Sequence, residues 1–480
     1  MAIISWLGSA YLIAATMTQT LSGKLTDIFG RRAGFLFCLI LFGVGNLACG
    51  LAKSETAVVL GRALAGVGGG GCNAISTFIA SDLIPLRRRG VWHGMGMVVY
   101  STGVGLGGVI GGVINESWGW RWAFILLTPF TVVSGVGVAY FLPALVSSKE
   151  QGLRTRLGRI DFGGSVVLVL AIALLLVGLN QEDFSDAASW RVMKIVLPLA
   201  AASFAVFIII ELYYAIEPVF PIQLLAKPST VGVCLTSWFT AMAVYTLMFY
   251  VPLYFQLRGC STSQTGLRLL PEPIGAGMGS FMAGVIMRLS GRYGVPKTFA
   301  FVLFLAGNTG FATVSLSTQS ILTELFLLAN GLGNGGILTV MLLALLSSVK
   351  HEHQAVITSI HYAFRSTGAT IGISVSSFVF RQLLKSRIGQ VPISGGLPTE
   401  FKPGDLGDVL RRCNRLTETG QDNCPRLMAA YMYALHGTFL LAMMFALAGF
   451  LCAMFTKNYQ LRTSFENEEI EGDKHANGDI

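Results

Sequence analysis

Several ionisable side chains lie inside stretches that are otherwise almost wholly apolar, among them Arg62, Glu272, His361 and Arg365. A charge inside hydrocarbon is costly unless it is paired or faces a polar cavity, so such residues usually belong to a pathway for ions, protons or charged solutes. His361 and Arg365 are four residues apart and share one face of a helix, and histidine exchanges protons near neutral pH. All four are candidates for a proton or substrate pathway.

Each candidate also has a plainer interpretation. Arg62 can extend to the lipid headgroups, His361 can simply be hydrogen-bonded, and Glu272 in "LPEPIG" can cap a helix or lie at the surface. Asn73 and Asn334 stand at comparable places in the two parts of the chain. These two amides either line a cavity or hydrogen-bond between helices.

The stretch "GKLTDIFGRR" places an acid, three bases and two glycines between two long apolar runs. Asp27 can pair with Arg31 and Arg32 near a helix start, while Gly23 and Gly30 allow a tight joint and close helix approach. We interpret these five residues as a charge latch between helix ends. The alternative is that the bases only set membrane orientation and that Asp27 is solvated.

The apolar runs define the elements that position these residues. Of the 480 residues, 53% are hydrophobic and 12% are charged, whereas about a quarter of a soluble protein is charged. Crossing a bilayer takes roughly twenty apolar residues in a helix. The sequence therefore predicts an all-α integral membrane protein with 13 visible spans, near 3–22, 33–52, 57–80, 91–114, 123–142, 163–180, 192–214, 231–254, 267–288, 298–317, 322–348, 356–380 and 431–455.

The distribution of basic residues predicts orientation. The short joints on the side of "GKLTDIFGRR" hold 15 lysines and arginines, and the opposite joints hold 4. Since short cytoplasmic loops are enriched in these residues, this side is expected to be cytosolic. The net charge of +9 then reflects membrane topology, and no nucleic-acid partner is expected.

Internal repeats indicate a duplicated architecture. "STGVGLGG" (101–108) matches "STGATIGI" (366–373), and "GVGG" (66–69) matches "GNGG" (333–336) at nearly the same offset. Parallel halves of this kind are typical of alternating-access carriers with a site between the halves. The predicted division is an N-terminal half (1–142), a linker with two extra spans (143–228), a C-terminal half with a lumenal loop (229–456, loop 382–430) and an acidic cytosolic tail (457–480).

These motifs resemble the major facilitator superfamily, and the resemblance covers almost the whole chain. "GKLTDIFGRR" is similar to the loop signature G-x-L-a-D-r-x-G-r-r, and "RALAGVGGGG" resembles the arginine motif of the fourth helix at Arg62. The resemblance implies that the latch favours the outward- or lumen-facing state. It also implies a role for Arg62 in proton handling.

"GVGLGGVIGG" resembles the antiporter motif of the same family, g-x-x-x-G-P-x-x-G-G. Its glycines are expected to let helices pack closely, although the proline of the motif is glycine at position 108; the residues are Gly103, Gly107, Gly108, Gly111 and Gly112. "GVGGGG" (66–71) also fits G-x-G-x-x-G, but it lies within a span and no strand precedes it. Helix packing is therefore a better explanation than dinucleotide binding.

Six plus two plus six helices resembles the fourteen-span drug:proton antiporter branch. That plan needs one more helix before 3–22, so we expect a first helix to be missing here. "SDLIPLRRRGVWHG" and "WGWRWAF" are similar to fungal vacuolar basic amino acid transporters.

Eight cysteines add one candidate contact. Cys413 and Cys424 share the long loop and can form a disulfide in an oxidising compartment, or they can remain free thiols. No Cys/His spacing indicates a metal site, and no cofactor is expected.

The resemblance implies a monomeric, proton-coupled carrier in the bilayer that moves a small cationic solute, expected to be a basic amino acid, into the vacuole. One alternative is a plasma-membrane exporter of drugs or toxins, and another is a non-transporting nutrient sensor. An enzyme is not expected, since no metal-binding or nucleophile motif lies at a membrane face.

Overall fold

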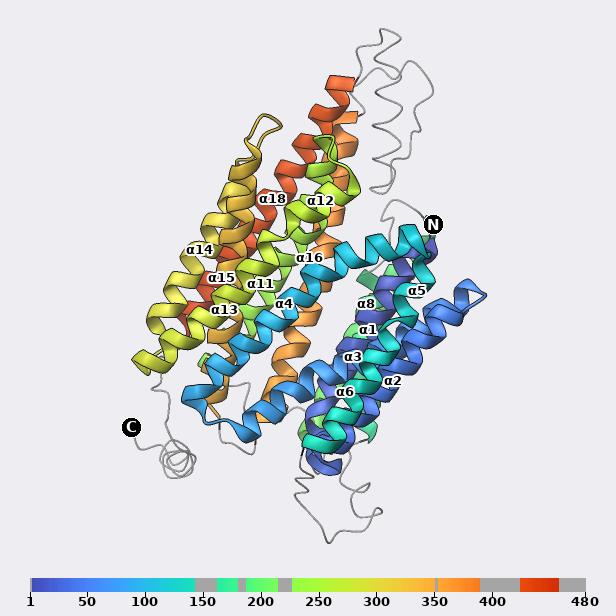
Figure 1. Ribbon diagram of the computed structural model, residues 1–480, viewed down its shortest axis with the longest axis vertical. Helices are drawn as coiled ribbons and strands as arrows, with labels where there is room; N and C mark the ends of the chain where they lie inside the picture. The colour runs from blue at the N-terminus through green and yellow to red at the C-terminus, as the bar shows by residue number, and fades with distance from the viewer. Residues whose placement is uncertain are drawn as a thin grey trace.

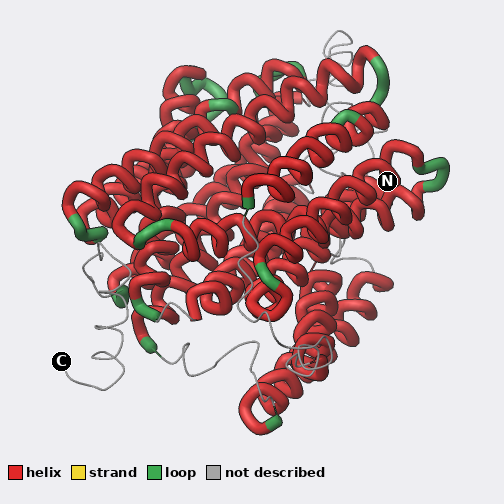
Figure 2. Tube along the Cα trace, turned by 60° about the horizontal axis from the view of Figure 1, so that its bottom comes forward, coloured by secondary structure: helices red, strands yellow, loops and turns green. Residues whose placement is uncertain are grey.

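The computed structural model describes residues 2–142, 162–179, 187–214, 227–349, 353–388 and 424–456. Within these ranges the chain is helical, with short loops and no strand (Figure 2). Every one of the 13 predicted spans lies on a helix, so the all-α prediction is confirmed. The linker residues 143–161, the tail 457–480 and Cys413 lie outside the described residues.

The first bundle holds six helices: α1 (Ala2–Phe29), α2 (Arg31–Leu51), α3 (Glu55–Leu83), α4 (Leu86–Ser117), α5 (Trp120–Ile125) and α6 (Leu127–Phe141). The helix α1 continues through Asp27, so most of the predicted joint is helical and only Gly30 separates α1 from α2. The predicted span 123–142 consists of two helices that meet at Leu126.

The second bundle holds α11 (Pro228–Leu257), α12 (Thr262–Leu269), α13 (Pro271–Ser290), α14 (Gly294–Ala312), α15 (Ser320–Ser347), α16 (Gln354–Ile388) and α18 (Cys424–Met454). Its core is rich in fully buried aromatic side chains, among them Tyr254, Phe304 and Phe439. The pair α8 (Phe162–Leu179) and α9 (Ala187–Tyr213) is separate in sequence from both bundles, and α8 packs on α1.

Eight stretches of the described chain are long and apolar enough to cross a bilayer, judged by length and composition. Large apolar side chains point outward from them; Phe130 and Phe141 on α6 are 72% and 80% exposed. Such a surface is stable against lipid. The helix α1 is less apolar because it buries Thr16, Gln19 and Thr20 against its neighbours.

Three described helices of the first bundle, α1, α3 and α4, reach the second. The helix α4 crosses between the bundles (Figure 1) and packs on α13, where Gly90 and Gly94 face Gly284 and Phe281. The helix α1 contacts α16. These contacts bring residues from distant parts of the sequence to one interface.

Candidate functional site at the interface of the two bundles

The joint between α1 and α2 is built around Gly30. Its φ of 93° lies in the left-handed region that favours glycine, so the chain reverses within one residue. This reversal starts α2 at Arg31 and directs the Arg31 side chain back toward α1. We call the end of the molecule that carries this joint the motif end.

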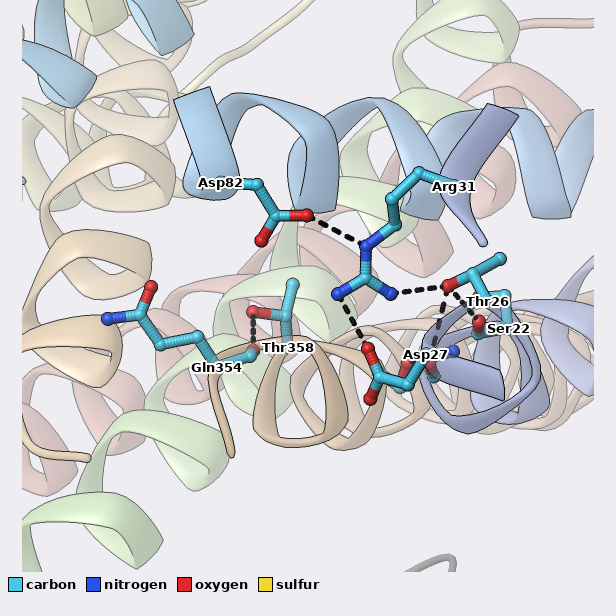
Figure 3. Close-up of polar contacts among 9 residues, drawn as sticks. Ser22, Thr26, Asp27, Arg31, Asp82, Gln354 and Thr358 are labelled. Carbon is cyan, nitrogen blue, oxygen red and sulfur yellow. Dashed lines mark hydrogen bonds and ion pairs between the residues drawn. The ribbon is translucent and has the colours of Figure 1, made fainter. Parts of the chain in front are cut away.

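Arg31 is the centre of a charged cluster at the motif end (Figure 3). Its Nη2 lies 2.6 Å from Asp27 Oδ1 and its Nε lies 2.9 Å from Asp82 Oδ2. Its Nη1 donates to Thr26 Oγ1 at 2.7 Å, and the guanidinium stacks on the Phe78 ring at 5.4 Å. One guanidinium therefore joins α1, α2 and α3 by charge-assisted hydrogen bonds.

Burial raises the pKa of the Asp27 carboxyl, and the attraction of Arg31 opposes that rise. The Arg31 side chain is 14% exposed and that of Asp27 is 30% exposed, so water still screens the pair. Asp82 was not among the predicted residues. It is 51 residues from Arg31 in sequence, and no local spacing signals such a contact.

The other predicted latch residues have different contacts. Arg32 turns away from Asp27, and its Nη2 donates to the Ala139 carbonyl of α6. The Gly23 N–H donates to Ser359 Oγ of α16 at 3.0 Å, and a Cβ on Gly23 would lie 2.9 Å from the Ala355 carbonyl oxygen. The charges thus join helices of the first bundle, and Gly23 is the latch residue that reaches the second.

Arg89 makes a further contact between the bundles that the sequence did not single out. The residue is 2% exposed. Its Nη1 donates to Gln354 Oε1 of α16 at 2.9 Å, and its Nη2 donates to the Ser81 carbonyl at 2.5 Å. From sequence, Arg89 counted only as one of three adjacent bases that indicate orientation.

Six hydrogen bonds between described residues join the two bundles. They link Gly23 to Ser359, Arg89 to Gln354, Arg87 to Arg288, Thr77 to Tyr362, His93 to Thr339 and Gln19 to Ser366. All six lie between the motif end and the level of Ser366. These hydrogen bonds between the bundles therefore gather toward the motif end, whereas the packing of α4 on α13 extends further, to Gly105 and Leu270.

Arg62 lies on α3 near the N-terminal part of α1. Its guanidinium stacks on the Tyr11 ring at 4.5 Å and lies 5.7 Å from the Phe124 ring. Stacking on aromatic faces stabilises a guanidinium away from water. Asn73, three helical turns along the same face of α3, has an exposed side chain and contacts none of the other candidates in the described structure.

Glu272 lies in the first turn of α13, inside the second bundle. The Asn334 side chain of α15 hydrogen-bonds to its carboxylate, and Gly331 lets α15 approach the Glu272 backbone closely. This place in the first turn agrees with the helix-capping role that the sequence offered, and the side chain is partly buried. The structure brings Glu272 and Asn334 together, which the sequence had predicted only as separate candidates.

His361 is 2% exposed, and its Nε2 lies 2.7 Å from Ser237 Oγ of α11. Arg365, one turn further along α16, is half-buried and interacts electrostatically with His361 and with His93 of α4. The predicted pair His361 and Arg365 therefore does lie at the interface of the bundles.

The glycine motifs differ in how they pack. A Cβ on Gly68 or Gly70 would collide with the backbone at Phe42 or Ala15, so close packing of "GVGGGG" is confirmed. By contrast, no atom lies within 4 Å of a Cβ placed on Gly103, Gly107 or Gly111. The packing predicted there is wrong for the described structure, because α4 makes its close approach earlier, at Gly90 and Gly94. The surroundings of Gly108 and Gly112 lie outside the described residues.

A groove of about 430 Å³ lies between α2 and α6 and is lined mainly by apolar residues such as Leu39, Ile40 and Val136. No charged residue lines it, and it lies away from the helices that contact the second bundle. The groove is thus separate from the candidate site.

An all-helical membrane protein with polar residues between two bundles has the architecture of a membrane transporter. Residues 1–373 match the Major Facilitator Superfamily, and the chain belongs to that family. It is similar to the multidrug resistance protein fnx1 of Schizosaccharomyces pombe, with 34% identity over 96% of this chain and 87% of that protein. It is also similar to the vacuolar basic amino acid transporter 2 of Saccharomyces cerevisiae, with 31% identity over 81% of this chain and 85% of that protein.

The fold is similar to that of the proton:xylose symporter XylE. The TM-score is 0.58 at 13% sequence identity, over 98% of this chain and 89% of that chain. At this identity the likeness concerns the fold alone. The chain is therefore a multi-pass membrane protein of a family that transports small solutes.

Proposed function

We propose that this chain is a proton-coupled, alternating-access transporter that moves basic amino acids into the fungal vacuole. The observation that carries the proposal is the set of hydrogen bonds that closes the bundles at the motif end, next to the charged residues of the interface. The motif end carries most of the short-loop lysines and arginines, so it faces the cytosol. The described state is then closed to the cytosol.

Two kinds of side chain support a charged amino acid as the solute. Glu272 supplies an acid and Arg365 a cation near the interface of the bundles, and both are costly within a membrane unless they serve a pathway. One relative is named as a vacuolar basic amino acid transporter, and another as a vacuolar membrane amino acid uptake transporter. Proton exchange is proposed because it lets the vacuolar proton gradient drive uptake.

The proposal is tested with vacuolar membrane vesicles from yeast cells that express the chain. ATP acidifies the vesicles, and uptake of labelled arginine, lysine and histidine is measured with and without a proton uncoupler. We expect uptake that exceeds that of vesicles lacking the chain and that the uncoupler abolishes. Uptake equal to the control for all three amino acids would contradict the proposal.

The similarity to a multidrug resistance protein favours a second candidate, a plasma-membrane exporter of drugs. A fluorescent fusion at the cell surface, together with drug sensitivity after deletion of the gene, would support the exporter. A fusion on the vacuolar membrane without drug sensitivity would favour the amino acid transporter.

A further inference from the structure

Arg365 has the features of an anion site. It is half-buried in the middle of α16, and among the described residues no hydrogen bond or ion pair to its guanidinium is found. The neighbouring Ser366 is engaged by Gln19, and His361 is engaged by Ser237. A guanidinium carries five donors in a planar fork that matches a carboxylate. Arg365 can therefore bind a carboxylate without first breaking a contact.

Glu272 has the complementary features. Its carboxylate accepts a hydrogen bond from the Asn334 amide, and no lysine or arginine in the described structure lies within ion-pair distance of it. A carboxylate can accept about four hydrogen bonds, so one amide leaves room for an ammonium or guanidinium. Tyr245 of α11 interacts electrostatically with both Glu272 and Arg365, so both charges lie in its neighbourhood.

The depths of Arg365 and Glu272 can be compared from a common reference. The first turn of α4 contacts both Gln354 of α16 and Arg288 of α13, through Arg89 and Arg87, so these two residues lie at a similar depth. At 1.5 Å per residue, Arg365 is about 16 Å along α16 from Gln354, and Glu272 is about 24 Å along α13 from Arg288. The backbone of Arg365 therefore lies about 8 Å nearer to the motif end than that of Glu272 along the helix axes.

We infer that Arg365 binds the α-carboxylate of an amino acid and that Glu272 binds the cation at the far end of its side chain. The inference rests on the proposed function and adds the orientation of the solute. The carboxylate points toward the motif end, and the side chain points away from it. A basic side chain would meet Glu272 with opposite charge, and an acidic side chain would meet it with like charge.

Three matched compounds test the orientation. L-Lysine carries both charged groups, 1,5-diaminopentane is lysine without the carboxylate, and L-norleucine is lysine without the side-chain cation. Uptake of each by the full chain is measured in acidified vesicles, and the shift in unfolding temperature of the purified protein is measured with each compound. We expect the unmodified chain to prefer lysine over both analogues by at least tenfold in half-saturating concentration.

Each substitution is expected to remove one preference only. Arg365→Gln abolishes the preference for lysine over 1,5-diaminopentane, and Glu272→Gln abolishes the preference for lysine over norleucine. Arg365→Lys keeps the charge but not the fork, so it gives an intermediate preference and serves if Arg365→Gln does not fold. Arg387→Gln is the control, because Arg387 lies at the end of α16 over the Tyr433 ring, and it keeps both preferences.

The results separate the two proposals. If the unmodified chain neither takes up lysine nor is stabilised by it, the proposed function fails. If it transports lysine but Arg365→Gln and Arg365→Lys weaken lysine and 1,5-diaminopentane equally, the transport function stands and the orientation is refuted. The orientation is also refuted if Glu272→Gln, and not Arg365→Gln, removes the preference for lysine over 1,5-diaminopentane.

Discussion

A side chain at position 23 is expected to open the motif end. A Cβ on Gly23 would lie 2.5 Å from Ser359 Oγ and 2.9 Å from the Ala355 carbonyl oxygen, whereas non-bonded carbon atoms prefer about 3.5–4.0 Å. Gly23→Ala therefore forces α16 away from α1 by part of an ångström. It also weakens the hydrogen bond from the Gly23 N–H to Ser359. Overpacking of this kind costs roughly 1–3 kcal/mol.

At about 1.4 kcal/mol per factor of ten, the lower part of this range lowers the ratio of closed to open molecules by roughly tenfold. The native thiol of Cys38 reports this change, since it is 5% exposed and lies in an apolar cluster with Ala355 and Tyr362 of α16. In a chain whose other cysteines are replaced by serine, labelling of Cys38 by a water-soluble maleimide should become about tenfold faster.

The control for this measurement is Gly96→Ala. No atom lies within 4 Å of a Cβ on Gly96, so its labelling rate should equal that of the parent chain. Gly23→Val should label faster than Gly23→Ala, because it is bulkier. Equal rates for Gly23→Ala and the parent, or the same increase for Gly96→Ala, would refute the assignment of Gly23 to the closure of the bundles.

Two further predictions concern the stability of the first bundle, measured as the unfolding temperature of the purified protein. Arg31→Gln should lower the unfolding temperature more than Asp27→Asn, because Arg31 also binds Asp82. In addition, burial raises the pKa of Asp27 and so already disfavours its ionised form. Equal losses for the two variants would contradict this prediction. Gly68→Ala should lower the unfolding temperature by several degrees and Gly107→Ala should not, since only the Cβ at position 68 meets backbone; a loss at position 107 would show a neighbour that the described structure lacks.

The helices could be predicted because the bilayer acts on each helix separately. An apolar run of about twenty residues is required whatever the neighbours are, so all 13 runs gave helices. Local breaks were less visible. Neither the break at Leu126 nor the continuation of α1 to Phe29 changes the apolar pattern.

The contacts of the site could be predicted only where both partners are near in sequence. Asp27 and Arg31 are four residues apart, and their pairing was expected. Arg89 and Gln354 are 265 residues apart, and neither residue carries a sign of the other. The glycines at 103, 107 and 111 show the same limit, since their spacing indicates a small face but not which helix, if any, covers it.

The distribution of charge favours a particular way for the bundles to separate. The ion pairs at the motif end, Arg31 with Asp27 and with Asp82, lie within the first bundle. The contacts between bundles are hydrogen bonds, such as those of Gly23 with Ser359 and Arg89 with Gln354. A hydrogen bond contributes about 0.5–1.5 kcal/mol net, or about 1.5–3 kcal/mol when one group is charged, and moving Arg31 away from its partners would break its charge-assisted hydrogen bonds to Thr26, Asp27 and Asp82 together.

Separation of the bundles at the motif end therefore costs less when the ion pairs stay intact. The charges that the sequence suggested as a latch between helix ends join α1, α2 and α3 in the described structure, and we propose that these three helices move as one unit. The uncharged face of that unit, at Gly23, is the part that must leave α16. This arrangement suits rocking of whole bundles, since the strong contacts persist in both states and only the weaker ones exchange with water.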